Sequence, residues 1–175
     1  MINYRQGIFE TNSSSTHAMI VGHAVPSDFP NYLHFALGEY GWEHNILSTP
    51  EEKASYLYTA AVILRDDYEV RQTLTEMLSH VDVAVNFDMP QYEFYTYNGE
   101  RHSYLTNAGI DHVGEDDQEE FVNDMLTNLG DLLCYLFSDE SYVITGNDNC
   151  TDEQYDWFHE KCNPSYEHKV YYKGN

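Results

Sequence analysis

A run of eight polar side chains near the N-terminus holds residue types that can move protons. It extends from Glu10 to His17 and stands directly before an apolar run, 18–21. Glu10 and His17 could serve as base and acid, because a carboxylate and an imidazole exchange protons close to neutral pH. Ordinary serine-rich turns have the same composition, so the run also fits a loop without chemistry. Between the acid and the imidazole lie an amide and hydroxyls that can bind a polar ligand, among them Asn12, Ser13, Ser14 and Ser15.

A cation stands close to this polar run. Arg5 precedes Glu10 by five positions, and its guanidinium could hold a phosphate. With hydroxyls as donors and Glu10 and His17 exchanging protons, the set suffices for metal-free cleavage of a phosphodiester through a neighbouring hydroxyl. A Ser-His-Asp hydrolase has less support, because Ser and His within one loop rarely reach the required geometry.

A second polar segment, 38–44, has two glycines on either side of an acid and an aromatic residue, followed by a tryptophan. We predict Glu39 as a further catalytic carboxylate and Trp42 as a binding residue, because a stacking ring beside carboxylates suits a base or a ribose. The alternative is a glycine turn in which Trp42 belongs to the core.

Two later segments carry acids and amides next to expected strand ends. Asp111 and His112 follow one such strand, and we predict them as ligand-binding residues. The segment 145–149 combines Gly, Asn and Asp, which are first of all turn residues. Asp111, His112 and Asp148 could also bind a divalent metal, but their spacing is not diagnostic. We therefore predict neither a metal nor a cofactor.

The chain is strongly acidic. Thirty acidic residues against eight basic ones give a formal net charge of −22. Such a surface repels free nucleic acid and favours a partner with a basic face. We therefore expect a basic nucleic-acid-binding protein as partner and no direct binding of free nucleic acid. Simple solubility, or a high-salt origin, is the alternative, although sixteen tyrosines are more typical of a contact surface.

Composition also bounds the compartment. Three cysteines, Cys134, Cys150 and Cys162, form no Cys-x-x-Cys pair, so a reducing cytosol fits better than a disulfide framework. No apolar run is long enough to cross a bilayer, and the first residues lack the pattern of a signal peptide. We expect a cytoplasmic protein without a membrane partner.

Helix signals stand at five places. Thr49, Pro50 and Glu52 form a capping box with proline at the first helical position, which predicts a helix from 50 to about 65. Thr151 and Gln154 predict a second capping box at the start of a helix through about 161. Apolar residues at helical spacing predict three more helices, at 68–79, 117–128 and 132–137.

Strand signals fill most of the remaining chain. Asn98 and Gly99 separate two strand-like runs, 92–97 and 100–105, and predict a hairpin with a type I′ turn. A strand, the polar loop and a second strand are expected within 1–24, and further strands at 32–37, 81–87, 142–145 and 166–172. At 175 residues and 42% apolar content, we predict one α+β domain, 1–175, with a mostly antiparallel sheet and helices packed on it.

Four segments follow one another in a fixed order. They are Arg-x-Gly-Ile-Phe-Glu-Thr-Asn-Ser-Ser-Ser-Thr-His at 5–17, Gly-Glu-Tyr-Gly-Trp-Glu at 38–43, Glu-Lys-x-Ser-Tyr-Leu at 52–57 and Ile-Asp-His at 110–112. In this order they resemble a family of small proteins from phages, plasmids and other mobile elements of Firmicutes. The resemblance covers roughly the first two thirds of the chain, and Ala18 and Tyr40 depart from the family pattern, where Ser and Phe are expected.

The resemblance implies an inhibitor of host defence, with type II anti-CRISPR proteins as the example. Some proteins of that class mimic the charge of DNA, and others act on the guide RNA. Three hypotheses follow. The chain cleaves or modifies a guide RNA carried by a CRISPR effector, through the polar run and Glu39; or it blocks a nucleic-acid groove by charge alone; or it acts on a free nucleotide unrelated to CRISPR. The first two hypotheses have equal support, and the third has less.

Overall fold

The computed structural model describes residues 15–41, 43–110, 115–147, 151–162 and 168–173, and within these ranges the chain forms five helices and ten strands. The helices are α1 (Pro50–Leu64), α2 (Asp67–Ser79), α3 (Glu115–Thr127), α4 (Leu129–Phe137) and α5 (Asp152–Lys161). The strands are β1 (Ser15–Val21), β2 (Tyr32–Phe35), β3 (Glu39–Tyr40), β4 (Asn45–Leu47), β5 (Ala84–Phe87), β6 (Tyr92–Tyr97), β7 (Glu100–Leu105), β8 (Gly109–Ile110), β9 (Tyr142–Asn147) and β10 (Lys169–Lys173).

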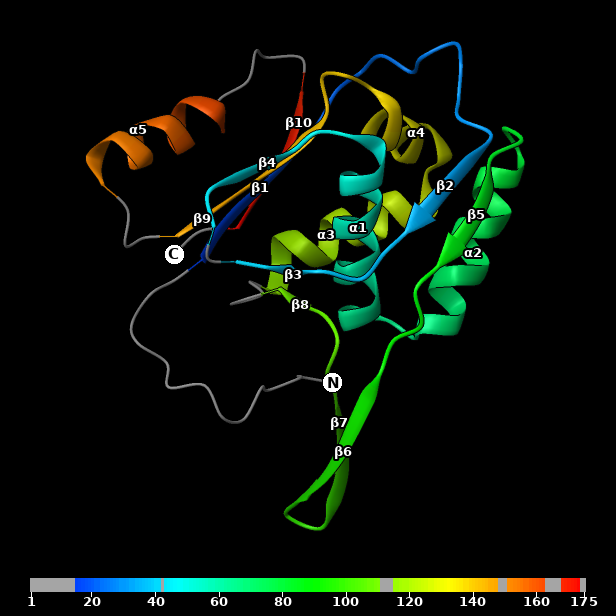
Figure 1. Ribbon diagram of the computed structural model, residues 1–175, viewed down its shortest axis with the longest axis vertical. Helices are drawn as coiled ribbons and strands as arrows, with labels where there is room; N and C mark the ends of the chain where they lie inside the picture. Colours follow the sequence, from blue (N-terminus) through cyan, green and yellow to red (C-terminus); the bar gives the residue numbers. More distant parts are fainter. Residues whose placement is uncertain (1–14, 42, 111–114, 148–150, 163–167, 174–175) are drawn as a thin grey trace.

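An antiparallel sheet with the strand order β10-β1-β9-β4 forms the largest sheet (Figure 1). Its central strand β1 is buried on both faces. Met19 and Val21 belong to the main core, whereas Ala18 and Ile20 pack with Phe158 of α5 on the other face. Burial on both sides explains why the apolar residues of β1 follow one another instead of alternating with polar ones. The predicted α+β class with a mostly antiparallel sheet is confirmed.

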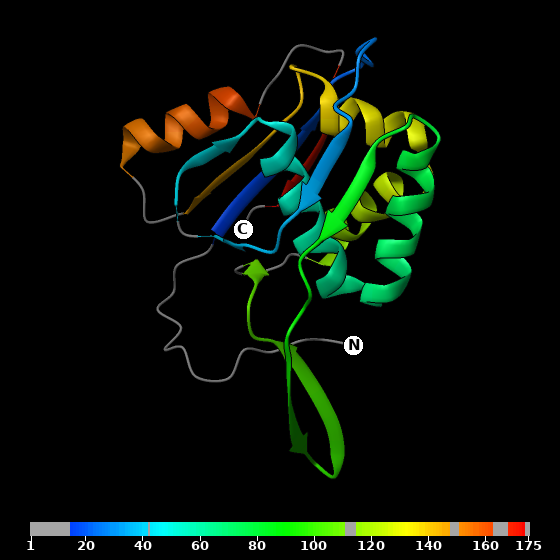
Figure 2. The same ribbon diagram turned by 45° about the vertical axis from the view of Figure 1, so that its right-hand side comes forward.

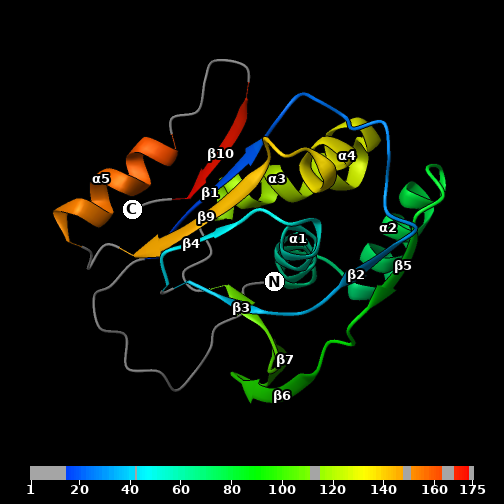
Figure 3. The same cartoon turned by 45° about the horizontal axis from the view of Figure 1, so that its top comes forward.

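Helix α1 occupies the middle of the protein, between the large sheet and the strand pair β2–β5 (Figure 3). Apolar residues surround it on nearly all sides, as expected for a central helix. The predicted capping box is present: Glu52 N lies 3.3 Å from Thr49 Oγ1, and Thr49 N lies 3.0 Å from Glu52 Oε2. Neither α1 nor any other helix in the described ranges is long and apolar enough to span a bilayer.

Strands β2 and β5 form a separate parallel pair, and α2 packs against β5 (Figure 2). Their connection runs through α1 and α2, as a parallel pair requires a long crossover. A second parallel pair joins β3 to β8, with Glu39 opposite Gly109 and Tyr40 opposite Ile110. Both pairs contact α1, the first through β2 and the second through β8.

Three predicted elements differ from the structure. The strand expected at 81–87 covers only β5, because residues 81–83 still bond back to the end of α2 and Asp82 has a φ of 57°. The strand expected at 32–37 ends at Phe35. The segment 38–44, expected as a loop, contributes β3 and leads into β4.

The polar run was expected to be a loop throughout, and this is wrong at its C-terminal end. Ser15, Thr16 and His17 open β1 and pair with β9. Pairing on both sides by β9 and β10 extends the strand into a polar segment that local composition alone would leave as a turn.

Candidate functional site

His17 lies inside the protein, and its imidazole contacts a tyrosine of α1. Nδ1 lies 2.8 Å from the hydroxyl of Tyr56, and both side chains are fully buried. The same hydroxyl lies 3.6 Å from the sulfur of Met19. Burial raises the pKa of Tyr56 far above its ordinary value, so the phenol stays neutral. A neutral phenol at this distance fixes the orientation of the imidazole.

Strand geometry explains why His17 is buried. Successive residues of a strand face opposite sides of the sheet, so His17, Met19 and Val21 share the face that packs on the helices. The backbone of His17 lies between Thr145 of β9 and Lys173 of β10. The imidazole is therefore held by a central strand and by a central helix.

Aromatic rings continue the contact from Tyr56 in two directions. The ring of Tyr40 lies 5.1 Å from that of Tyr56, and the ring of Phe121 in α3 lies 6.5 Å from it. Burial raises the pKa of Tyr40 to about 12. Tyr40 connects β3 to the same cluster that holds His17, so the second predicted segment and the polar run meet through Tyr56.

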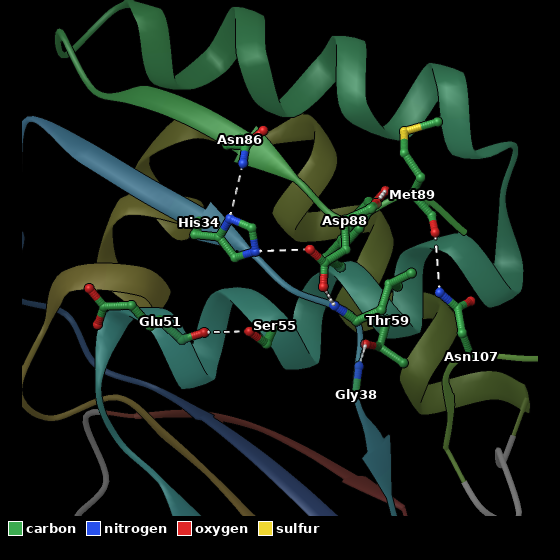
Figure 4. Close-up of polar contacts among 11 residues, drawn as sticks. His34, Gly38, Glu51, Ser55, Thr59, Asn86, Asp88, Met89 and Asn107 are labelled. Carbon is green, nitrogen blue, oxygen red and sulfur yellow. Dashed lines mark hydrogen bonds and ion pairs between the residues drawn. The ribbon is translucent and has the colours of Figure 1, made fainter. Parts of the chain in front are cut away.

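A polar cluster on β2 and β5 holds the chain that leads into β3 (Figure 4). Asp88 accepts a hydrogen bond from Leu37 N at 3.1 Å, and its other oxygen lies 3.1 Å from His34 Nε2. The amide nitrogen of Asn86 lies 3.3 Å from His34 Nδ1. Both ring nitrogens of His34 therefore have partners, and the arrangement supports a turn, not a reactive group.

Gly38 also helps to hold the chain that leads into β3, and it lies close to the ring of Tyr40. Its N–H donates to Thr59 Oγ1 at 3.1 Å (Figure 4). A Cβ at this position would lie 2.8 Å from the ring and hydroxyl of Tyr40, closer than real contacts allow. A side chain at position 38 would therefore force the ring of Tyr40 to shift from its contact with Tyr56.

The structure places three of the predicted site residues. His17 and Ser15 are buried in β1, and Glu39 is exposed on β3. Among the described residues, no group of three or more His, Cys, Asp or Glu side chains could hold a metal ion. The other predicted site residues lie outside the described ranges: Arg5, Glu10, Asn12, Ser13, Ser14, Trp42, Asp111 and His112.

The described ends of all four polar segments nevertheless lie in one region, which we call the strand-end region. Ser15 pairs with Asn147 at the end of β9, and Thr145 Oγ1 donates to the carbonyl of Glu43 at 2.6 Å. Because β3 and β8 are parallel, Tyr40 and Ile110 end the two strands side by side. The strand-end region consists of Ser15, His17, Tyr40, Glu43, Ile110, Thr145 and Gly146.

Two buried residues escaped the sequence analysis. Tyr56 stands within the segment 52–57 of the family resemblance, but nothing in the sequence links it to His17. Gln118 is almost fully buried on the core-facing side of α3, and neither atom of its amide has a hydrogen-bond partner. Its position three residues before Phe121 on the apolar stripe was the available signal. A buried unpaired amide costs about 1–3 kcal/mol, so this position favours a polar ligand or water.

Comparison with known proteins returned nothing: no protein-family model, curated protein or solved structure matches the chain.

Proposed function

We propose that this protein inhibits a host defence nuclease of the CRISPR type, in the host cytoplasm, by occupying the basic groove of a nucleic-acid-binding protein. The observation that carries the proposal is the scarcity of available positive charge on an acidic chain. An acidic body in which several of the described cations are already engaged is complementary to a groove that binds phosphates.

The described basic side chains are largely neutralised. Arg65 lies 3.0 Å from Glu119, Arg71 lies 2.7 Å from Asp67, and Lys169 pairs with Asp124. Lys53 is buried and donates to the backbone carbonyls of Ser138 and Ser141 at 2.8 and 3.1 Å. These contacts make the four cations less available to phosphates, which supports contact with a basic protein more than with free nucleic acid.

The carboxylates, in contrast, face solvent. On α5, Asp152, Glu153, Asp156 and Glu160 are all exposed, and α3 exposes Glu119 and Glu120. These helices lie on different faces of the large sheet (Figures 1 and 3), so the negative field covers more than one side. A partner that contacts both α3 and α5 would therefore face exposed carboxylates on each side of the large sheet.

A DNA-cleavage assay with a guide-loaded type II effector tests the proposal. We expect inhibition by the wild type to weaken with rising salt, because exposed charges are screened within about 10 Å at 0.1 M. Reversal of charge in Asp156→Lys with Glu160→Lys should weaken inhibition and flatten its salt dependence. The control is Asp156→Glu, which keeps the charge. Full inhibition by the reversed variant would contradict charge occupancy.

Catalysis on a guide RNA or nucleotide is the second candidate, with Glu10, His17 and Glu39 in the catalytic roles. It is favoured by the meeting of the polar segments in the strand-end region. Incubation with guide-loaded effector, followed by RNA electrophoresis, separates the two candidates. If the wild type cleaves the RNA and the Glu10→Gln variant leaves it intact, catalysis is favoured over occupancy of the groove. If the wild type inhibits the effector and the RNA stays intact, occupancy of the groove is supported.

A further inference from the structure

The hairpin β6–β7 projects from the body of the protein as an isolated ribbon (Figures 1 and 2). Its strands pair only with each other among the described strands. Two-stranded ribbons are at best marginally stable on their own, so a projecting one needs a firm base.

Hydrogen bonds at the base supply that support. Gln91 N donates to Asn107 Oδ1 at 2.9 Å, and Thr106 N donates to the carbonyl of Gln91 at 2.8 Å. The amide of Asn107 donates to the carbonyl of Met89 at 3.2 Å. These bonds hold the two legs of the ribbon together at its base.

One face of the ribbon carries rings and carboxylates. The register places Tyr95 opposite His102, with Glu93 opposite Tyr104 and Tyr97 opposite Glu100. The rings of Tyr95 and His102 are stacked at 5.3 Å, and Tyr104 donates to the carboxylate of Glu93. We call this face the tyrosine strip; it comprises Glu93, Tyr95, Tyr97, Glu100, His102 and Tyr104.

The opposite face has a different chemistry. There Arg101 lies over the ring of Phe94, at 4.1 Å from its centroid. Arg101 is the sole basic residue of the hairpin apart from His102, so the tyrosine strip itself has no permanent cation for a phosphate. On the tyrosine strip, the side chain of Tyr97 is 61% exposed. Exposed tyrosines on a defined scaffold are typical of contact surfaces.

We propose that the tyrosine strip docks arginine side chains of a basic partner protein. Ring faces attract a guanidinium and the two carboxylates pair with it, so the strip offers both interactions that arginine makes best. Nucleic acid is the poorer occupant, because its phosphates would meet Glu93 and Glu100. The inference rests on the proposed function, since it names the element that meets the basic protein.

Binding of a fluorescent all-arginine peptide, compared with an all-lysine peptide of equal length, tests the docking. General attraction to an acidic protein acts on both peptides, whereas ring stacking favours arginine. For Tyr95→Ala with Tyr97→Ala, we expect affinity for the arginine peptide to fall roughly tenfold and the preference over lysine to disappear. The control is Phe94→Ala, which removes a ring of similar exposure, 59%, from the opposite face.

Tyr97→Thr serves as a second variant because a β-branched residue keeps the strand, and hydrogen exchange of the hairpin amides confirms that the ribbon is formed. An equal loss in Phe94→Ala, unchanged arginine binding in the strip variants, or binding of an RNA oligonucleotide that needs the same tyrosines would overturn the inference.

The effector assay separates this inference from the proposed function. If the strip variants lose the arginine peptide but inhibit the effector fully, the docking role fails and the proposed function stands. If the wild type does not inhibit the effector but keeps its ring-dependent arginine preference, the proposed function fails and the arginine-binding strip stands.

Discussion

His17 belongs to a polar run by its neighbours in sequence and to the core by its place in β1. Its partner Tyr56 lies 39 positions away along the chain, so no local pattern links them. The contact joins the first strand to the central helix at a point where an unpaired imidazole nitrogen would be costly. The same residue thus supports the fold and stands in the strand-end region.

Tyr56→Phe tests that support. The substitution keeps the ring and removes the hydroxyl that bonds His17 Nδ1 at 2.8 Å. We expect the free energy of unfolding to fall by about 1–3 kcal/mol, since a buried polar atom loses its partner. Urea denaturation measures the change. Tyr68→Phe, at a residue 65% exposed, should leave stability unchanged and serves as the control. Equal stability of both variants would show that the contact contributes nothing.

Lys53 is the second buried polar residue with a defined role. Its ammonium donates to the carbonyls of Ser138 and Ser141, which follow the end of α4, where a helix presents unpaired carbonyls. Burial lowers the pKa of Lys53 to about 8 from its ordinary 10.5. The folded protein therefore releases this proton before the unfolded chain does.

A pH series on Lys53→Met measures this linkage. Between about pH 8 and 10 the unfolded chain binds more protons at Lys53 than the folded protein does, so this residue makes stability rise with pH. We expect the wild type to gain stability relative to Lys53→Met across this window, by urea denaturation at each pH. A constant difference between the two proteins would mean that Lys53 keeps its ordinary pKa.

At the scale of elements, the features predicted correctly are those encoded locally. The capping boxes at Thr49 and Thr151 and the Asn98-Gly99 turn use side chains within three residues of each other, and all three are confirmed. The short strands β3, β4 and β8 were missed because each exists only through pairing with a distant segment. Their two or three residues carry no readable period.

The Asn98-Gly99 turn allows a prediction for the hairpin alone. Gly99 has a φ of 83°, which disfavours a side chain, yet a Cβ there would meet nothing within 4 Å. Gly99→Ala should therefore act only through the backbone, at about 1 kcal/mol. We expect amide exchange in β6 and β7 to accelerate roughly fivefold, with global stability unchanged. Glu100→Ala is the control; unchanged exchange in Gly99→Ala would contradict the turn's role.

The candidate site was only partly predictable for a related reason. Side-chain types predicted His17 and Glu39 as catalytic residues; in the structure His17 is buried and Glu39 is exposed. That Ser15, Tyr40 and Ile110 lie in one region follows from strand register, which depends on pairing across the whole chain. No spacing in the sequence encodes that register.

At the scale of the whole molecule, carboxylates and tyrosines are distributed differently between the surface and the core. Carboxylates cover the outside, where three of the described cations are paired with them. Tyrosines divide between the core, with Tyr56, Tyr135 and Tyr171, and the surface. The buried tyrosines give the protein a stability limit at high pH that its surface charge alone would not.

Alkaline titration tests that limit. Burial raises the pKa of Tyr40 and of Tyr58 to about 12, and it raises the pKa values of Tyr56, Tyr135 and Tyr171 well above the ordinary value. Above about pH 10 the unfolded chain loses phenol protons that the folded protein keeps, so stability falls as pH rises through this range, opposing the gain from Lys53.

Two optical signals recorded together should separate the two tyrosine populations. We expect a first rise in phenolate absorbance while the circular dichroism stays unchanged. A second rise in absorbance should then coincide with the loss of the dichroism signal, because the buried phenols ionise only as the core opens. Tyr56→Phe removes one buried phenol and should reduce the second step alone. A single absorbance step with an intact dichroism spectrum would show that the buried rings ionise within the folded protein, and that the core around His17 admits water.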